Sequence, residues 1–405
     1  MIERWQEKLL REEIRTRRGV HLTGARQSGK TTLAEFVAQN EMRHLTLDDD
    51  RLLKAAKDDP FSFVDRRDGR TLVVDEIQKA VELLNAIKIR VDHDSSPGQY
   101  LITGSSNLHF TKAVKDSLAG RFGRVRLRTL TLGEVSGGKG DFLMRAFAHD
   151  IPSTLPTFDK RDVIHAAFCG GYPEPISYGE RARRRWYVEY MQDLLTKDVQ
   201  DVTEVRKLAA LQKVSDWMMA YSSKFFELND LCKAAQLGKE TLANYLSVLK
   251  AMYVVDEVAP WSGSDYGKLG KRVKHFAADA GLVANLQGWD EDRVYYDDDK
   301  CGKLVETWVY HELAALIDQD ESYELTQYRD GEKREIDFVV KGPAGALLGL
   351  EVKSGSVSQG DFKHLKWFRD NLAKGDFTGV VLYSGRETLS FGSKCYAVPL
   401  SALAV

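Results

Sequence analysis

Short apolar runs alternate with helical stretches over the first third of the chain. Apolar residues recur at helical spacing between these runs, for example in the stretch TTLAEFVAQ that begins at Thr31. Strands that alternate with helices are typical of a parallel sheet covered by helices. The pattern therefore predicts an α/β domain whose strands occupy residues 19–23, 44–47, 71–74, 100–103 and 125–130.

The pattern changes twice beyond this region. Helices dominate from about residue 136 to 215, and a compact unit of helix, turn, helix and strand follows at 225–261. From about residue 263 the pattern is mixed again, with apolar strands such as EIDFVV, LLGLEV and GVVLYS. We therefore expect four parts: a sheet domain with an N-terminal helix (1–135), a helical lid (136–215), a winged helix (216–262) and a second α/β domain (263–405).

Composition limits the class of protein but does not indicate a specific function. A length of 405 residues fits two to four domains, and a net charge of −2 confines any nucleic-acid surface to a local patch. The four cysteines are far apart, which argues against a zinc site or a disulfide framework. No apolar run approaches the roughly 18 residues that span a bilayer. We expect a cytoplasmic protein without a membrane segment.

The stretch GARQSGKT, residues 24–31, has the spacing of a phosphate-binding loop between a strand and a helix. Its glycines let backbone N–H groups wrap phosphates at a helix N-terminus. Lys30 is expected to reach the β- and γ-phosphates of ATP, and the Thr31 hydroxyl to bind Mg²⁺. The predicted nucleotide-binding residues in this segment are Gly24, Ala25, Arg26, Gln27, Ser28, Gly29, Lys30, Thr31 and Thr32.

An apolar strand that ends in two acids, TLVVDE, follows about forty residues later. Asp75 is expected to hold Mg²⁺ through water, and Glu76 to polarise the attacking water. A second acid beside the magnesium residue favours hydrolysis of ATP over binding alone.

Two further segments carry candidate residues for the same reaction. Ser105 or Asn107, in the stretch TGSSN, is expected to sense the γ-phosphate, unless the stretch is only a loop of turn formers. Arg121 and Arg124 precede the last strand, where an arginine can point into a neighbouring subunit's nucleotide. The alternative is a surface salt bridge, but if Arg121 acts in this way, activity requires a homo-oligomer.

The ordered series GARQSGKTTL, LTLDDD, VVDEIQ, LITGSSN, LAGRFGR and GGYPEP resembles a group of prokaryotic AAA+-type P-loop ATPases. Members of this group carry a C-terminal winged helix and a domain with a restriction-endonuclease-like fold. The resemblance continues through KHFAADAGL, GKLVETWVYHEL, QYRDGEKREIDFVV and LEVKSG, so it covers nearly the whole chain. Ala25 stands where the family often has proline. The resemblance implies ATP and Mg²⁺ as cofactors and a homo-oligomer, for which a hexameric ring is one candidate arrangement.

Carboxylates and a lysine also follow the strands of the C-terminal third. Asp337 and Glu351 are predicted on two strands, and Glu351 and Lys353 point to the same face because side chains alternate along a strand. Two carboxylates beside a lysine suit phosphodiester hydrolysis with Mg²⁺. With Glu306 on an upstream helix, the set is similar to the PD-(D/E)xK nuclease signature. The alternatives are a fold used only for binding, or an exposed Glu351–Lys353 ion pair.

The helix–turn–helix unit offers a second possible DNA contact. Residues 240–253 are expected to form the recognition helix, and this face is only mildly basic, so DNA-backbone binding and protein packing are equally compatible with it. His311 is expected on a helix surface. The candidate DNA-binding residues are Arg183, Arg184, Lys239, Asn244, Lys250 and Lys271.

Three hypotheses follow from these features. The leading one is an oligomeric ATPase that positions or moves DNA for a fused magnesium-dependent nuclease, with structured or branched DNA as one candidate substrate. The second is a regulatory switch ATPase that binds a protein partner through an inactive nuclease-like module. The third is a DNA-remodelling motor that grips the duplex without cutting it.

Overall fold

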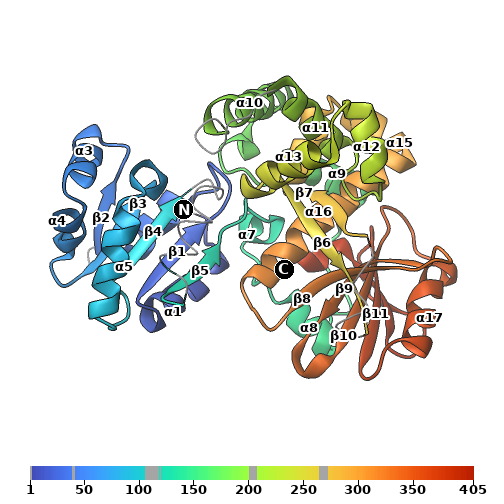
Figure 1. The fold of residues 1–405 in the computed structure, drawn as a ribbon. Helices are drawn as coiled ribbons and strands as arrows, with labels where there is room; N and C mark the ends of the chain where they lie inside the picture. Colours follow the sequence, from blue (N-terminus) through green and yellow to red (C-terminus); the bar gives the residue numbers. More distant parts are fainter. Residues whose placement is uncertain (1, 39–41, 105–117, 119, 200–207, 264–271) are drawn as a thin grey trace.

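The computed structural model of the chain describes residues 2–38, 42–104, 118, 120–199, 208–263 and 272–405. Figure 1 shows two bodies side by side, with the N-terminal sheet in one and the helices and strands that follow it in the other. The first body corresponds to the predicted sheet domain, and the second contains the other three predicted parts.

A parallel sheet with the strand order β2-β3-β4-β1-β5 forms the first body within the described residues. This confirms the predicted α/β class, and each predicted strand is found within a few residues of its expected position. Strand β1, which precedes the phosphate-binding loop, is separated by β4 from β3, which ends at Asp75. The five strands are β1 (Gly19–Thr23), β2 (Met42–Thr46), β3 (Thr71–Asp75), β4 (Tyr100–Gly104) and β5 (Phe122–Arg126).

Alternation along the strands divides the apolar side chains between the two faces of this sheet. Val73 and Leu101 face α1 (Gln6–Thr16) and α2 (Lys30–Ala38), where they pack with Leu10 and Leu33. Leu72, Val74 and Ile102 point to the opposite face, into a core that includes residues of α4 and α5. The helices on this face are α3 (Asp50–Asp58), α4 (Pro60–Val64) and α5 (Leu83–His93).

Helices and a second sheet build the larger body, and the larger of its two apolar cores is shared between them. Residues from all three remaining predicted parts belong to that core, among them Tyr187, Leu246 and Trp308. The helices predicted as a lid therefore pack into this body. Its helices are α7 (Leu132–Ser136), α8 (Phe142–Ala148), α9 (Lys160–Cys169), α10 (Glu180–Asp193), α11 (Leu208–Ala220), α12 (Leu228–Ala235), α13 (Lys239–Ala251), α14 (Ala280–Leu286), α15 (Glu291–Tyr296), α16 (Asp298–Asp318) and α17 (Lys363–Asn371).

The second sheet has the order β12-β13-β11-β10-β9-β8-β6-β7 among the described residues. Strand β6 (Val255–Pro260) belongs to this sheet, so the boundary predicted between residues 262 and 263 divides one sheet. The reason is that β6 pairs with β7 on one edge and β8 on the other. The remaining strands are β7 (Lys274–Ala277), β8 (Glu324–Arg329), β9 (Glu335–Lys341), β10 (Leu347–Val352), β11 (Phe377–Tyr383), β12 (Leu389–Ser390) and β13 (Cys395–Pro399).

A buried charge network joins the two bodies. Arg126 donates two hydrogen bonds to Asp256 at 2.9 Å, and Arg128 donates to Asp256 at 2.7 Å and to Asp318 at 2.6 Å. The Tyr310 hydroxyl donates to the same Asp256 carboxylate at 2.8 Å. Although burial alone would raise it, Arg126 and Arg128 hold the pKa of Asp256 well below its usual range. The edge of the first sheet is thus tied to β6 and α16 of the second body.

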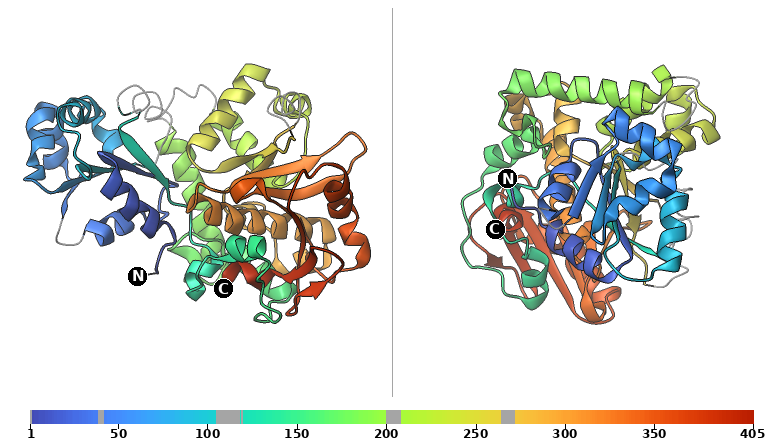
Figure 2. Two further views of the ribbon diagram at one scale, coloured as in Figure 1. Left: turned by 90° about the horizontal axis from the view of Figure 1, so that it is seen from below. Right: turned by 90° about the vertical axis from the view of Figure 1, so that its left-hand side faces the viewer.

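Both ends of the chain lie against the short helix α7 at this junction (Figure 2). The Trp5 indole donates to the Gly138 carbonyl at 3.0 Å, and the Ser136 hydroxyl donates to the Ala404 carbonyl at 3.2 Å. Across the described part of the chain, no helix is both long enough and apolar enough to cross a membrane.

Candidate functional site

The loop between β1 and α2 has the backbone of a phosphate cradle. Gly24, Gln27 and Gly29 have positive φ angles of 152°, 61° and 96°. A Cβ on Gly24 would lie 2.1 Å from the Leu127 carbonyl oxygen, so only glycine fits there. The loop can therefore turn its N–H groups towards an anion at the N-terminus of α2.

Lys30 lies inside this loop with only 5% of its surface exposed. Its ammonium donates to the Ala25 carbonyl at 2.8 Å and to the Gly24 carbonyl at 3.2 Å. Burial lowers the pKa of Lys30 to about 8, against the opposing effect of Glu76 and Asp75. A bound phosphate would supply the negative charge that this buried ammonium lacks.

The residues expected to hold magnesium meet at one point. The Thr31 hydroxyl donates to Asp75 Oδ2 at 2.8 Å, although the two residues are on different elements. The Thr103 hydroxyl, at the end of β4, donates to the other oxygen of Asp75. An oxygen pair of this kind fits Mg²⁺, which usually takes one or two protein ligands together with phosphates and water. Magnesium bound there would neutralise phosphate charge, and Thr31 and Asp75 would orient it.

Glu76 follows Asp75 with a left-handed backbone, φ 56° and ψ 43°. Its N–H points at the Thr103 hydroxyl over 3.4 Å, and its carboxylate accepts a hydrogen bond from the Gln78 amide. Burial raises the pKa of Glu76 above its ordinary value, which brings it closer to that of an effective general base. Glu76 therefore follows directly after Asp75, at the position where the base for the attacking water is predicted.

The other predicted loop residues have different surroundings. Arg26 forms a 2.6 Å ion pair with Asp198, and its carbonyl accepts from the Tyr190 hydroxyl at 3.2 Å, so the loop contacts the second body. Ala25 and Ser28 are buried, and Thr32 is exposed on α2.

Arg4, which the sequence reading did not select, fixes the outer side of the loop. Its guanidinium donates to the Ser28 carbonyl at 2.9 Å, to the Arg128 carbonyl at 2.7 Å and to Glu134 at 3.0 Å. No sequence motif marks such an arginine, because its partners are brought together only by the fold.

Ser105 and Asn107 lie outside the described residues. Arg121 is paired with Asp92 of the same chain, and Arg124 donates to the Tyr253 hydroxyl at 3.3 Å. Within one chain, neither arginine lies at the nucleotide loop.

The predicted C-terminal acids gather at one end of the second sheet. Asp337 on β9 and Glu351 on β10 lie on neighbouring antiparallel strands, and the Val352 N–H donates to Asp337 at 2.9 Å. Burial raises the pKa of Glu351 well above its ordinary value, with Asp337 adding to the shift. Lys353 forms a 3.4 Å ion pair with Asp361.

Lys274, on β7, was missed by the sequence reading and changes this cluster. Its ammonium is 2.6 Å from Glu306, 2.9 Å from Glu335 and 3.8 Å from Asp337, and only 1% of its side chain is exposed. Glu306, predicted as a metal ligand, is thus an ion-pair partner of a buried lysine. A lysine in an apolar strand was the available signal, because buried lysines are almost always paired.

Of the three predicted carboxylates, Glu306 lies closest to Lys274, and Asp337 and Glu351 lie further from it. The described residues contain no group of three or more His, Cys, Asp or Glu side chains arranged to hold a metal ion. Two carboxylates still fit Mg²⁺ in principle. The predicted three-carboxylate site is therefore reduced to a possible two-carboxylate site.

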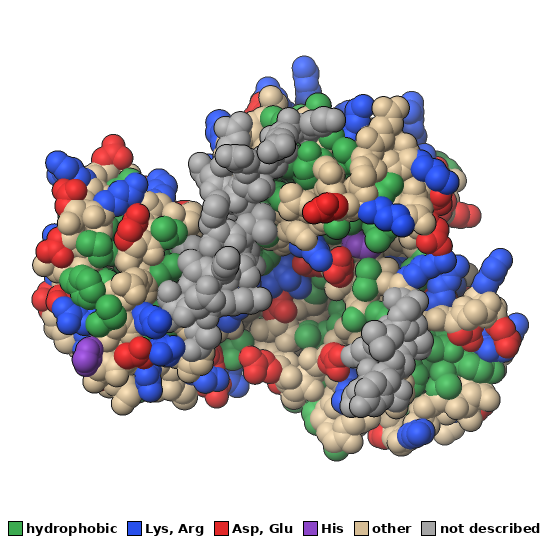
Figure 3. Space-filling view, viewed as in Figure 1, with side chains coloured by type: hydrophobic (Ala, Val, Ile, Leu, Met, Phe, Trp, Pro, Cys, Tyr) green, Lys and Arg blue, Asp and Glu red, His purple; other side chains and the backbone are tan. Residues whose placement is uncertain are grey.

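The predicted DNA contacts are divided between surface and interior. Arg183 is 3% exposed and donates to the Cys169 sulfur at 2.9 Å, so it does not face solvent as predicted. The reason is that this turn of α10 faces α9 instead of the surface. Arg184, Lys239 and Asn244 are exposed, Lys250 is half-buried beside Glu257 at 2.9 Å, and Lys271 lies outside the described residues. In the face drawn in Figure 3, Lys and Arg side chains are interspersed with Asp and Glu.

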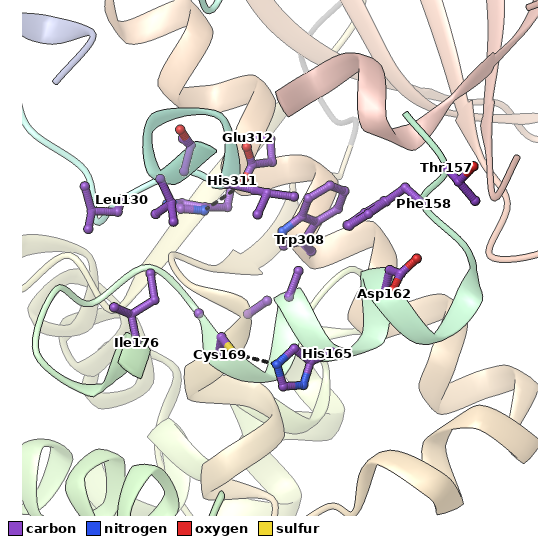
Figure 4. A pocket seen from close by; sticks show the side chains of 16 residues that line it. Leu130, Thr157, Phe158, Asp162, His165, Cys169, Ile176, Trp308, His311 and Glu312 are labelled. Atoms are coloured by element: carbon purple, nitrogen blue, oxygen red, sulfur yellow. Dashed lines mark hydrogen bonds and ion pairs between the residues drawn. The ribbon is translucent and has the colours of Figure 1, made fainter. Parts of the chain in front are cut away.

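His311 is buried, which corrects the expectation of a surface histidine. It has 3% of its surface exposed, and its Nε2 lies 2.9 Å from the Thr129 hydroxyl. His311 lines a cavity of about 450 Å³ between the segment after β5, α9 and α16 (Figure 4). In this cavity Cys169 and His165 come from α9, and Trp308 and Glu312 from α16.

The strand order, the loop and the acidic pair together define a P-loop ATPase. Residues 16–136 match the family model of the AAA domain, a stretch that contains all five strands of the first sheet. Residues 160–293 and 301–403 match two domains of unknown function (DUF8612 and DUF4143). The chain therefore carries an AAA-type ATPase domain followed by two modules whose models name no function.

The relatives that match most of this chain are themselves described as uncharacterized. The chain is 26% identical over 354 residues to the uncharacterized proteins Mb2031c of Mycobacterium bovis and Rv2008c of Mycobacterium tuberculosis, over 85% of this chain and 73% of theirs.

Two solved structures are similar at a low level. The Walker-type ATPase PABY2304 of Pyrococcus abyssi has a TM-score of 0.43 at 15% identity, over 71% of this chain and 96% of that one. A RuvB variant of Thermotoga maritima has a TM-score of 0.26 at 15% identity, over 70% and 92%. Scores this low support no conclusion about function.

Proposed function

We propose that this protein is a magnesium-dependent ATPase whose hydrolysis cycle acts on a DNA-binding C-terminal body. The observation that supports it is the direct connection between the two bodies. β5 pairs with the loop strand β1, and the arginine stretch that begins at Arg124 bonds to β6 and α16. A change at the nucleotide therefore has a rigid, hydrogen-bonded route to the second body.

The exposed face of α13 is the proposed DNA contact. Lys239 and Asn244 are exposed there, and Arg184 adds a cation on α10. Contacts of this type bind phosphates and do not read base sequence. We include a homo-oligomer in the proposal, in which Arg121 reaches a neighbouring subunit's nucleotide in place of its contact with Asp92.

A second candidate function is cleavage of DNA by the C-terminal body. It rests on Asp337 and Glu351 on neighbouring strands, with Lys353 two residues further along. The position of Lys274 argues against DNA cleavage. Its ammonium pairs with Glu306, so fewer carboxylates remain to bind magnesium. The other alternative is a switch that binds a protein partner through this body.

One set of assays distinguishes these functions. ATP hydrolysis is measured for the wild type, Lys30→Ala and Glu76→Gln, with and without linear or branched duplex DNA, and DNA cleavage is followed in the same samples. We expect Lys30→Ala to lose ATP binding, and Glu76→Gln to keep binding while turnover falls about a hundredfold or more, since the base is removed.

The effect of DNA on ATP hydrolysis, together with DNA binding and cleavage, distinguishes the proposed function from its alternatives. Stimulation of hydrolysis by DNA supports the proposed function, and hydrolysis indifferent to DNA with no DNA binding contradicts it in favour of the protein-partner switch. Magnesium-dependent cleavage that is lost in Asp337→Ala but kept in Lys30→Ala supports the nuclease. DNA binding without any cut product supports a motor that does not cleave.

A further inference from the structure

Two side chains that were not among the predicted site residues hold the two acids at the end of β3. Thr103, fully buried at the end of β4, donates to Asp75. Gln78 lies on the short helical turn after Glu76 and donates its amide N–H to the Glu76 carboxylate. The end of β4 thus contacts Asp75 directly through Thr103 and Glu76 indirectly through Gln78, which lies against Gly104.

The Gln78 amide lies against a position on β4 that has no side chain. A Cβ added to Gly104 would lie 2.9 Å from Gln78 Oε1, while the next nearest atom, Ile77 Cγ2, is 3.8 Å away. Gly104 has ordinary strand geometry, since its φ is not among the positive values. A side chain at position 104 would therefore require the Gln78 amide to shift.

A direct ion pair with Lys30 would compete with the observed position of the Glu76 carboxylate. Lys30 attracts the Glu76 carboxylate electrostatically, yet the ammonium donates to the carbonyls of Gly24 and Ala25 instead. A direct Lys30–Glu76 ion pair would remove both the phosphate-binding cation and the base. The hydrogen bond from Gln78 opposes that collapse, because it holds the carboxylate on its own side of the site.

We propose that Gln78 is a positioning residue for ATP hydrolysis, which holds the Glu76 carboxylate ready for the attacking water and is itself seated against Gly104. This inference rests on the proposed ATPase function and names the residues that make its base effective. Gln78 touches neither nucleotide nor water in this role and acts only through Glu76.

The test compares three variants with the wild type. In Gln78→Ala the donor is lost, in Gly104→Ala the added methyl displaces the Gln78 amide, and the double variant carries both changes. We expect the kcat for ATP to fall about tenfold in each single variant, a part of the 10²–10⁴-fold contribution of a general base. The affinity for a fluorescent ATP analogue and the thermal midpoint are expected to stay near wild-type values.

The double variant separates positioning from general damage. Since Gly104→Ala acts through Gln78, we expect the double variant to be no slower than Gln78→Ala alone. Gly238→Ala is the matched control, because no atom lies within 4 Å of its added Cβ. Its turnover is expected to equal that of the wild type.

Several outcomes overturn the inference. A lower thermal midpoint together with weaker analogue binding would mean that Gln78 has a structural role only. Multiplied losses in the double variant would mean that Gly104 acts independently of Gln78. Unchanged turnover in both single variants while Glu76→Gln is inactive refutes the inference alone, whereas full activity of Glu76→Gln refutes the proposed hydrolysis site itself.

Discussion

At the scale of single residues, burial sets the chemistry of this protein more than local sequence does. Lys30 and Lys274 are buried and Glu76 is half-buried, and each of the three is hydrogen-bonded or ion-paired. The same applies to Glu312 on α16, which is 1% exposed and accepts the Leu132 N–H at 2.9 Å. Burial raises the pKa of Glu312 to about 8 from its ordinary 4.5.

Glu312 predicts a pH dependence of stability. A carboxyl group whose pKa is higher in the folded state binds its proton more tightly there, so stability is lost as pH rises from about 5 to 8. We expect Glu312→Gln to remove this contribution. The thermal midpoint of the variant, relative to that of the wild type, should therefore rise between pH 5 and pH 8. Thermal melts across this range test the point.

The control is Glu189→Gln, since Glu189 is exposed on α10. Its midpoint is expected to follow the wild type at every pH. Parallel curves for the wild type and Glu312→Gln would contradict the assignment.

At the scale of elements, the phosphate loop is held from outside its own motif. Arg4 precedes α1 and bonds to the Ser28 carbonyl, while Arg26 pairs with Asp198 beyond α10. A loop rich in glycine has little stiffness of its own, because glycine does not restrict the backbone. The neighbouring elements therefore contribute to the shape that binds phosphate.

Arg4→Ala is predicted to weaken ATP binding. The Ser28 carbonyl loses its donor, and Glu134 is left buried without its cation, which costs about 3–5 kcal/mol in stability. We expect the dissociation constant of a fluorescent ATP analogue to rise several-fold in titrations below the unfolding temperature. Arg4→Lys, which keeps the charge, should lose less stability and still bind less tightly than the wild type.

Arg15→Ala serves as the comparison, because Arg15 is exposed on α1. It should bind the analogue like the wild type. Equal binding by Arg4→Ala and Arg15→Ala would show that the loop keeps its shape without Arg4.

At the scale of the whole molecule, the two bodies meet through charged side chains, whereas the three predicted parts of the second body share an apolar core. Asp256 is central to that contact, with Arg126, Arg128 and Tyr310 around it. Charges buried in this way are costly when one partner is removed.

Asp256→Asn is predicted to destabilise the contact by about 3–5 kcal/mol, since Arg126 loses its closest carboxylate and the buried Arg128 keeps only Asp318. We expect differential scanning calorimetry to show the ATPase body unfolding separately from, and below, the second body. Stimulation of ATP hydrolysis by DNA should also decrease, because the proposed route between the bodies is broken.

Asp292→Asn is the matched change, since Asp292 is 75% exposed in its pair with Arg161. Its effect should stay within about 0.5 kcal/mol. A single unaltered transition in Asp256→Asn would refute a coupling role for this network.

The sequence by itself determined the first sheet and the position of the glycine-rich loop. Alternating strands and helices locate β1–β5, and the loop with Lys30 and Thr31 is local, so its geometry follows from the residues within it. Spacing also predicts that Asp337 and Glu351 lie on strands that come together.

Only the tertiary structure decided which residues complete these sites. Lys274 enters the carboxylate cluster from a strand about thirty residues before Glu306, Arg183 turns inward, and β6 joins the C-terminal sheet. Gln78 lies next to the acidic motif, but its role depends on Gly104 from another strand. Such contacts join positions far apart in the chain, and no local pattern of residues encodes a distance that only packing sets.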